Sequence, residues 1–383
     1  MTSDGILQKR HKSRFSARQI LRSSGIARVV LLLAVWCVTL LFGLIPYDNY
    51  GAKWVSPAEV DDGIRFGKYG LAFGQIPDLA ALDDTNNSLE VNLELRVDAL
   101  NTRGFQVLAY IGASKGANPI ILGQWRQYLV VMQGYDFANK ASKPRLTVDI
   151  TQWAGNVFDW RIVLNQNRNT MYIDGVPVST HSPSTFSLDK LEPMLSIGNT
   201  LNGKQGWAGV INRFTAEHKN TDAGIITPLV EYDFTQVVAD DQIRNRVQDA
   251  NHLTIPEVGR FPEHLFLNDR KLENLFTNSP FDLFINFVGF FPLAFCLVYL
   301  LKLQLPNLPP VLVAGFSLII GVSTSLLIEF TQQYIPGRNS DLHDLVLNSA
   351  GVLAGTVIGM ALSTVAVWLS HRRMLSRARR VRR

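Results

Sequence analysis

The chain has 383 residues, of which 47% are apolar, and its mean hydropathy is slightly positive. This length exceeds one ordinary domain, and the composition indicates that part of the chain lies in a membrane. Both cysteines, Cys37 and Cys296, fall inside apolar runs, which excludes a zinc or redox motif. The net charge of +5 comes from two basic ends. The remainder carries 23 basic against 31 acidic residues, which argues against a nucleic-acid-binding protein.

The two basic ends predict the orientation of the chain. Residues 1–28 carry seven Lys or Arg against one acid, and residues 370–383 carry seven Arg and no acid. By the positive-inside rule both segments are predicted to be cytoplasmic tails. Contact with anionic lipids adds to this interpretation.

The first tail is followed by an uncharged apolar run at 29–45, which is 17 residues long. About 17 residues is the lower limit for crossing the hydrocarbon core of a bilayer. A signal peptide is the alternative, but its apolar core usually has about 7–15 residues and ends at a small-residue cleavage site. The run here ends in "LIPYDNY" without such a site. We therefore predict an uncleaved transmembrane anchor.

Residues 47–235 have the pattern of short β-strands. The segment "SLEVNLELRVD" alternates apolar and polar residues with a period of two. The segment "YIDGVPV" places Asp174-Gly175 between strand-like runs, which is a typical hairpin signal. Many short strands without helical periodicity predict an antiparallel β-sandwich. A mixed connector follows at 236–279.

The strands of this region resemble the concanavalin A-like lectin/glucanase superfamily, of the laminin-G-like type. The matching pieces are "LEVNLELRV", "NRNTMYIDGVPV", "LSIGN" and "GWAGVINRF". The resemblance implies a jelly-roll sandwich. It leaves the activity open, because the superfamily contains both lectins and hydrolases.

A hydrolytic sandwich needs two close carboxylates, about 5–5.5 Å apart in a retaining glycosidase. Glu90, Glu94 and Asp98 are spaced by four residues on one strand, on the face that the apolar alternation predicts to be solvent-exposed. Sugar binding is the alternative, because tryptophan stacks on sugar rings, although a sandwich core also uses this residue. The stacking candidates are Trp125, Trp153, Trp160 and Trp207.

Three further charge-free apolar runs lie within residues 280–369, at 284–301, 311–328 and 345–369. Together with the anchor they predict four spans, which place both tails in the cytoplasm and residues 47–279 on the outer side. The predicted fold class is therefore a multidomain membrane protein, with an all-β antiparallel sandwich outside the membrane and an α-helical transmembrane bundle.

Polar pairs occur at the predicted outer ends of the last three spans. Two residues four apart lie on one face of a helix. The pairs are Asp282 with Asn286, Glu329 with Gln333, and Asp344 with Asn348, and Arg338 lies in the outer turn. Small residues lie on the same helix faces as these pairs, and small residues let membrane helices approach closely. Those predicted to pack are Gly321, Gly351, Gly355 and Gly359.

These groups predict a polar pocket in the bundle, because a charge that faces lipid costs about 2.5–3.5 kcal/mol at the membrane centre. The alternative is a set of helix caps and ion pairs, with Asp341 capping the last span and Arg338 paired with Glu329 or Asp344. One guanidinium cannot neutralise several carboxylates, so a cation, a shared proton or a cationic ligand group would complete the pocket. The nearby His343 is interpreted as a surface residue.

The set of polar and small residues resembles the VanZ-like family over residues 280–365. The matching positions are Asp282, Asn286, Pro292, Glu329, Gln333, Arg338, Asp344, Asn348, Gly351 and Gly355. The namesake of that family is associated with low-level resistance to teicoplanin, a glycopeptide that targets the cell wall. No established reaction comes with the family, so the resemblance carries over no catalytic residue.

The two resemblances together imply a bacterial cell-envelope protein of the inner (cytoplasmic) membrane. We expect its sandwich to bind an envelope polysaccharide or a peptidoglycan-related glycan, and its pocket to bind a lipid or glycan headgroup. A membrane-embedded enzyme that uses Glu329 or Asp344 as general acid or base and a glycosidase-like sandwich remain alternatives. Three spans with a shallow, one-sided site do not suit the alternating access that a transporter needs. No cofactor is indicated; a cation in the pocket, Ca²⁺ in the sandwich and the oligomeric state stay open.

Overall fold

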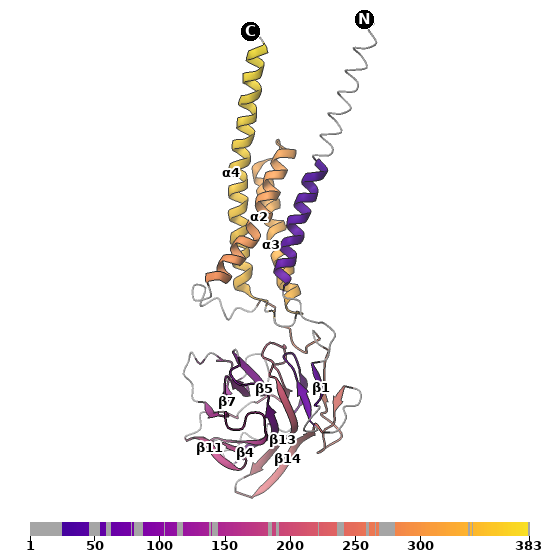
Figure 1. The fold of residues 1–383 in the computed structure, drawn as a ribbon, viewed down its shortest axis with the longest axis vertical. Helices are drawn as coiled ribbons and strands as arrows, with labels where there is room; N and C mark the ends of the chain where they lie inside the picture. Colours follow the sequence, from indigo (N-terminus) through magenta and orange to yellow (C-terminus); the bar gives the residue numbers. More distant parts are fainter. Residues whose placement is uncertain are drawn as a thin grey trace. The chain divides into compact units, whose positions relative to one another are not determined.

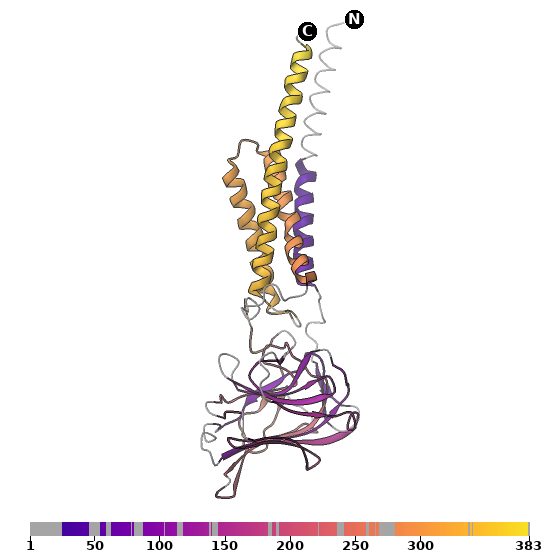
Figure 2. The same cartoon turned by 90° about the vertical axis from the view of Figure 1, so that its left-hand side faces the viewer.

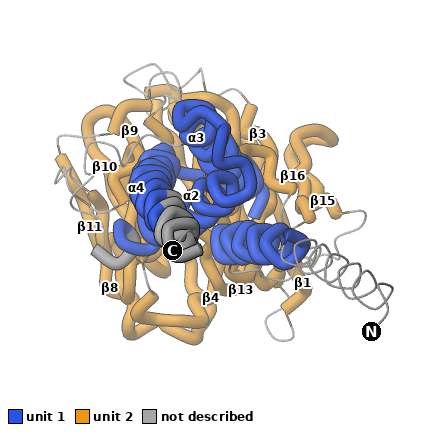
Figure 3. The backbone as a smooth tube through the Cα atoms, turned by 90° about the horizontal axis from the view of Figure 1, so that it is seen from above, with its two compact units in different colours: residues 1–47, 265–335, 339–383 blue, residues 48–264, 336–338 orange. Residues whose placement is uncertain are grey.

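A computed structural model describes residues 25–45, 54–58, 63–77, 79, 87–102, 104–112, 118–137, 139, 145–182, 186–188, 191–220, 222–235, 241–257, 260–264, 266–267, 280–335, 338 and 340–381. The chain divides into two compact units, which Figure 3 shows in different colours. The first unit comprises residues 1–47, 265–335 and 339–383, and the second comprises residues 48–264 and 336–338.

The first unit contains helices that are long and apolar enough to cross a membrane. They are the helix over Gly25–Leu44, α2 (Pro280–Gln304), α3 (Pro310–Gln332) and α4 (Leu342–Val381). The four predicted spans are confirmed by length and composition. Figures 1 and 2 show the four helices running alongside one another. The helix α4 extends beyond the span predicted to end at 369, because the arginine-rich segment continues the helix to Val381.

Glycines set the close approach of α4 to its neighbours. A Cβ atom added to Gly351 would lie 2.0 Å from the carbonyl oxygen of Phe287 in α2, and one added to Gly355 would lie 2.4 Å from that of Phe291. Both glycines therefore allow backbone contact that a side chain would prevent. The other two predicted packing positions are Gly321 and Gly359. A Cβ atom added to Gly321 would meet the Val352 side chain, and one added to Gly359 would meet the carbonyl oxygen of Phe295.

The helix over Gly25–Leu44 packs against α3 through polar as well as apolar groups. The Trp36 indole Nε1 donates a 3.0 Å hydrogen bond to Thr324 Oγ1. The Gln332 amide Nε2 donates a 2.6 Å bond to the carbonyl oxygen of Gly43. This helix therefore packs as part of the first unit.

The second unit is a sandwich of two sheets. The first sheet has the order β1 (Val55–Pro57), β2 (Ile64–Phe66), β13 (Gly209–Asn220), β4 (Asn87–Val97), β9 (Val157–Asn165), β10 (Asn169–Ile173), β11 (Val176–His181), and β14 (Ile225–Asp233) pairs with β13. The second has the order β15 (Gln242–Ile243), β16 (Leu253–Thr254), β3 (Ala72–Gln75), β12 (Met194–Ile197), β5 (Phe105–Ile111), β6 (Ile120–Trp125), β7 (Tyr128–Gln133), β8 (Leu146–Asp149). Neighbouring strands within each sheet are antiparallel, so the predicted antiparallel sandwich is confirmed.

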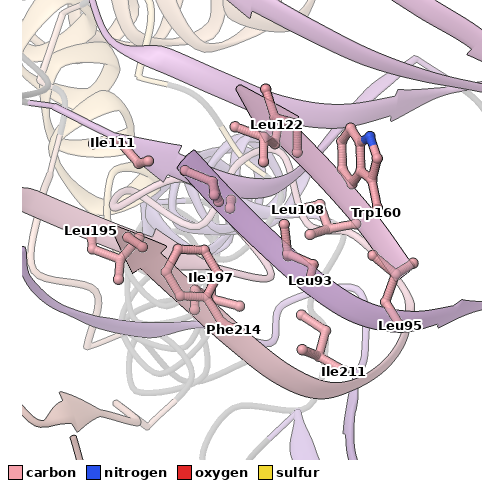
Figure 4. Packing of buried hydrophobic residues seen from close by; sticks show 14 of the residues in the cluster. Leu93, Leu95, Leu108, Ile111, Leu122, Trp160, Leu195, Ile197, Ile211 and Phe214 are labelled. Atoms are coloured by element: carbon pink, nitrogen blue, oxygen red, sulfur yellow. The ribbon is translucent and has the colours of Figure 1, made fainter. Parts of the chain in front are cut away.

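The core lies between the two sheets. Leu93 and Phe214 from the first sheet and Leu122 and Leu195 from the second have no exposed surface, and Figure 4 shows these side chains directed into one layer. The strand β4 alternates buried and half-buried residues along its length, as its period of two predicts. Burial of a side chain of this size contributes about 1.5–3 kcal/mol.

Two local features follow from the sequence. The hairpin β10–β11 turns at Asp174 and Gly175, whose φ angles of 49° and 77° are those of the predicted Asp-Gly turn. The connector predicted at 236–279 contributes β15 and β16, which extend the second sheet beyond β3. The buried Ile255 shows that this stretch packs on the sandwich.

Candidate functional site

The start of α2, the end of α3 and the start of α4 are joined by side-chain hydrogen bonds. Asn286 Nδ2 in α2 donates a 2.7 Å bond to Asp344 Oδ1 in α4. The backbone amide of Asp341 donates a 2.7 Å bond to Glu329 Oε2 at the end of α3. One turn further into the bundle, Asn348 Nδ2 donates a 2.9 Å bond to Ser325 Oγ. We call Asn286, Ser325, Glu329, Asp341, Asp344 and Asn348 the polar cluster.

The polar cluster is mostly withdrawn from the surface. Glu329 is 1% exposed and Asn348 is 4% exposed, whereas the Asp344 side chain is 24% exposed. The Asn348 Oδ1 atom is buried and has no hydrogen-bond partner within the described part of the chain. The cluster therefore offers carboxylate and amide oxygens, which accept hydrogen bonds from a ligand or a cation.

Helix capping accounts for part of this geometry. Asp341 Oδ1 accepts a 3.1 Å hydrogen bond from the backbone amide of His343, which is the pattern of an N-cap residue. The interpretation of His343 as a surface residue is wrong: its exposure is 1%, and its Nδ1 lies 3.4 Å from Asp344 Oδ1. The turn that caps α4 folds this ring inward.

The remaining predicted members have other surroundings. Gln333 is buried, and its amide Nε2 donates a 2.9 Å bond to the carbonyl oxygen of Phe330 on its own helix. Asp282 lies in the first turn of α2, but its side chain is outside the described part of the structure. Arg338 belongs to the second unit, where its charge acts on Lys204.

The sequence places Ser317 on the interior face of α3, but the polar residue opposite it, Thr356, was not predicted. Ser317 Oγ in α3 and Thr356 Oγ1 in α4 are 2.8 Å apart and buried. Gln332 was also missed, although it ties α3 to the first helix. Steps of four residues through Ser317 and Ser325 indicated which face of α3 points into the bundle. They do not indicate which hydroxyl of α4 lies opposite that face.

The four tryptophans predicted as stacking candidates differ in solvent exposure. Trp160 and Trp207 have no exposed surface and belong to the sandwich core, so they are corrected from stacking candidates to core residues. Trp207 Nε1 donates a 3.0 Å bond to the buried Gln124. Trp153 is half-buried and packs against the same core.

Trp125 is the stacking candidate that solvent reaches. It is 42% exposed at the end of β6, where its ring stacks on Tyr128 with a centroid distance of 6.3 Å. The Arg126 guanidinium lies 4.9 Å from the indole centroid. Because Arg126 has a φ of 57° in this tight turn, the backbone fixes the platform at the tip of the hairpin. We call Trp125, Arg126 and Tyr128 the aromatic platform.

The carboxylates of β4 lie on the half-exposed face, as predicted. Glu90 Oε1 lies 3.2 Å from the Arg161 guanidinium. Glu90 also lies directly opposite Glu217 of β13 in the strand register, which no sequence pattern indicated. Burial, and next the charge of Glu90, raise the pKa of the Glu217 carboxyl. Like charges directly opposite each other destabilise a sheet.

Metal binding receives no support from the described residues, among which no group of three or more His, Cys, Asp or Glu could hold a metal ion. The polar cluster contains paired carboxylates and amides instead of a converging ligand set.

Comparison with solved structures gives distant likenesses. Sheep galectin-11 in complex with glycerol is 10% identical, with 34% of this chain and 89% of that chain covered and a TM-score of 0.25. The binding domain of botulinum neurotoxin DC in complex with rat synaptotagmin II is 12% identical, with 50% of this chain and 43% of that chain covered and a TM-score of 0.30. This chain thus spans less than half of the neurotoxin chain. Such values carry no information on ligand or activity.

The curated proteins include no match to the chain. Residues 229–363, however, match the protein family described as VanZ/LLP1. The matched segment begins in β14 and includes α2, α3 and most of α4, with the whole polar cluster. The C-terminal part of this chain is therefore a VanZ-like membrane domain.

Proposed function

We propose that this protein is a non-enzymatic component of the bacterial cell envelope. In this proposal the sandwich binds a glycan outside the inner membrane, and the polar cluster recognises the headgroup of a lipid or a lipid-linked glycan. The observation that carries the proposal is the polar cluster itself. Three helices long enough to span a membrane bring ionisable or amide side chains together at one end of the bundle, and ionisable groups within such helices are commonly functional.

The chemistry of the polar cluster favours binding over catalysis. The Glu329 carboxylate is 1% exposed and already accepts a backbone hydrogen bond, so a substrate proton has little access to it. A general acid or base must come within hydrogen-bond reach of the reacting group. Asp344, which is more exposed, supplies an acceptor oxygen to a ligand that carries hydroxyl or ammonium donors.

The aromatic platform supports glycan binding by the sandwich. An exposed indole offers an apolar face to a sugar ring, and Tyr128 and Arg126 beside it supply polar edges. Binding of the intact protein in detergent to an array of bacterial envelope glycans tests this part. We expect Trp125→Ala to lose binding at least about tenfold, and Val157→Ala, which changes another exposed apolar residue of the sandwich, to keep it. Equal binding by both variants would contradict the platform.

The orientation of the chain is part of the proposal. The basic ends support a cytoplasmic location for both termini and an outer location for residues 47–279. Reporter fusions at residue 60, at residue 305 and at the C-terminus should report outside, inside and inside. An inside signal at residue 60 would contradict binding of an external glycan.

A more specific proposal is that this envelope protein contributes to glycopeptide resistance. It is supported by the VanZ-like domain and is tested by teicoplanin susceptibility of cells with and without the protein. If the polar cluster carries this role, Asp344→Asn should abolish the difference in susceptibility. Thr364→Ala, which changes an exposed hydroxyl of the same helix, should preserve it.

A further inference from the structure

The amide oxygen of Asn348 is a buried acceptor that has no donor. Asn348 is 4% exposed, and its Nδ2 donates the 2.9 Å bond to Ser325 Oγ. Its Oδ1 has no hydrogen-bond partner among the residues that the structure describes. A buried polar atom without a partner costs free energy, which a ligand that donates a hydrogen bond to this oxygen would recover.

The Asn348 amide lies one helical turn from two carboxylates of the polar cluster. Asn348 follows Asp344 by four residues on α4, and its partner Ser325 precedes Glu329 by four residues on α3. Residues four apart in a helix lie on one face, with Cβ atoms about 5–6 Å apart. The amide therefore lies between α3 and α4, one turn further into the bundle than the carboxylates.

Asp344 connects this buried amide to the surface. The Asp344 side chain is 24% exposed, and its Oδ1 accepts the 2.7 Å bond from Asn286 of α2. A hydrogen bond joins heavy atoms about 2.9 Å apart, so one nitrogen that donates to two acceptors bridges up to about 6 Å. This distance matches the spacing of side chains four residues apart. A single donor group that enters beside Asp344 therefore reaches the Asn348 oxygen.

The polar cluster also has an excess of negative charge. Its carboxylates are Glu329, Asp341 and Asp344, and the basic residues of the same stretch of sequence are Arg338 and His343. Three carboxylates exceed two basic groups, even when His343 is counted as charged. An opposite charge favours the ionised form of a carboxylate. The charge of the cluster therefore favours a positively charged ligand.

The unpartnered oxygen and the negative charge together select one headgroup chemistry. The oxygen requires an N–H or O–H donor, whereas the carboxylates favour a cation. A primary ammonium group supplies both, because one charged nitrogen carries three N–H donors. A glycerol headgroup supplies donors without positive charge, and a choline headgroup supplies positive charge without donors.

We propose that the polar cluster binds a primary ammonium group, which donates hydrogen bonds to Asp344 and to the Asn348 amide oxygen. The ammonium group belongs either to a lipid headgroup, as in phosphatidylethanolamine, or to a free amine. The inference rests on the proposed function, because it specifies the headgroup that the polar cluster recognises.

Matched lipids test this chemistry. Phosphatidylethanolamine, its N,N-dimethyl form and phosphatidylcholine share the phosphate and the acyl chains but lose N–H donors step by step. Phosphatidylglycerol keeps hydroxyl donors and lacks the ammonium group. Native mass spectrometry of the intact protein in detergent measures the affinity for each lipid. We expect phosphatidylethanolamine to bind at least about tenfold more tightly than phosphatidylcholine or phosphatidylglycerol, and the dimethyl lipid to lie between them.

Three variants locate the site. Asp344→Asn removes the charge at nearly constant shape and should weaken phosphatidylethanolamine binding by about tenfold. Asn348→Leu removes the unpartnered oxygen and should reduce the preference over phosphatidylcholine to less than about twofold. Thr356→Val is the matched control, because Thr356 is also a buried polar residue of α4, and its hydroxyl lies 2.8 Å from that of Ser317. This variant should keep the preference.

A competition arm distinguishes the two sources of the amine. Ethanolamine or choline is added at equal ionic strength to protein that carries bound phosphatidylethanolamine. Displacement by ethanolamine, but not by choline, identifies a free primary amine as sufficient. Retention of the lipid in the presence of either compound identifies the lipid headgroup as the source.

Two outcomes would overturn the inference. One is equal affinity of the unmodified protein for phosphatidylethanolamine and phosphatidylcholine. The other is an unchanged preference in both Asp344→Asn and Asn348→Leu, which would place the bound lipid elsewhere on the bundle. The proposed function would survive the first outcome if a lipid-linked glycan or phosphatidylglycerol bound selectively and Asp344→Asn abolished that binding. It would fail as well if no lipid or lipid-linked glycan bound selectively.

Discussion

The Glu329 carboxylate accepts a 2.7 Å hydrogen bond from the backbone amide of Asp341, which ties the end of α3 to the start of α4. Twelve residues separate these groups in the chain, and both are nearly inaccessible. The bond satisfies one of the amides that a helix leaves free at its N-terminus. Glu329 thus stabilises the turn between α3 and α4 and is also a member of the proposed headgroup site.

Replacement of Glu329 should show whether its hydrogen bond or its charge stabilises the turn. Glu329→Ala leaves a buried amide without its acceptor, and we expect a loss of stability of about 1–3 kcal/mol. Glu329→Gln keeps an acceptor oxygen and should lose less than half of that. Unfolding in detergent measures both variants, with Thr364→Ala as the control on an exposed part of α4. Equal losses for the Ala and Gln variants would mean that the charge, and not the hydrogen bond, sets the stability.

Asn286 and Asp344 should be energetically coupled. Their side chains share a 2.7 Å hydrogen bond between α2 and α4, and contacting residues show interaction energies of about 0.5–3 kcal/mol. A double-mutant cycle with Asn286→Ala and Asp344→Ala measures this coupling. A parallel cycle that combines Asn286→Ala with Thr364→Ala should be additive. Additivity in both cycles would show that the bond contributes nothing in the membrane domain.

Gly351→Ala should destabilise the bundle, by about 1–3 kcal/mol. The added methyl group would overlap the carbonyl oxygen of Phe287 at 2.0 Å, so α2 and α4 must move apart. Gly289→Ala is the matched control, because nothing lies within 4 Å of a Cβ at that position of α2. Helix propensity alone would make both substitutions favourable. Opposite signs for the two variants in thermal unfolding would therefore report helix packing directly.

Glu217→Gln should stabilise the sandwich near neutral pH. The folded pKa of Glu217 lies above its ordinary value, so the folded state binds more protons than the unfolded state in the window between the two values. Stability therefore falls as pH rises through that window and stays lower above it. The substitution should remove this fall and add up to about 1 kcal/mol at pH 7. Tm values between pH 4 and 7 check it.

Glu231→Gln is the control for the Glu217 experiment. Glu231 lies 2.8 Å from the Arg213 guanidinium, so its neutralisation removes an attraction rather than a repulsion. We expect no gain in stability at neutral pH from this variant. A similar gain from both variants would indicate a general effect of net charge on the sandwich.

The stability of the sandwich should rise above pH 8. Burial, and next the charge of Arg338, lower the folded pKa of Lys204 to about 8 from its ordinary value of 10.5. Between these values the unfolded chain binds more protons, so stability increases with pH. The full effect is on the order of 3 kcal/mol. Tm values at pH 7.5 and 9.5 should differ more for the unmodified protein than for Lys204→Met; equal differences would mean that Lys204 is neutral or well solvated.

Local patterns determined much of this architecture. The period of two in β4, the Asp-Gly turn after β10 and the long uncharged runs are each properties of neighbouring residues. They therefore predict a strand, a hairpin and membrane spans without knowledge of the fold. Steps of four residues predicted which helix faces carry polar groups, because helix geometry fixes that relation.

Tertiary structure decided which residues meet. Trp125 and Trp160 look alike in the sequence, but one ends a strand at a hairpin tip and the other faces the opposite sheet. The pairing of Glu90 with Glu217 depends on strand register across more than a hundred residues. Such contacts depend on the packing of the whole chain, because the free energy of each local segment does not include them.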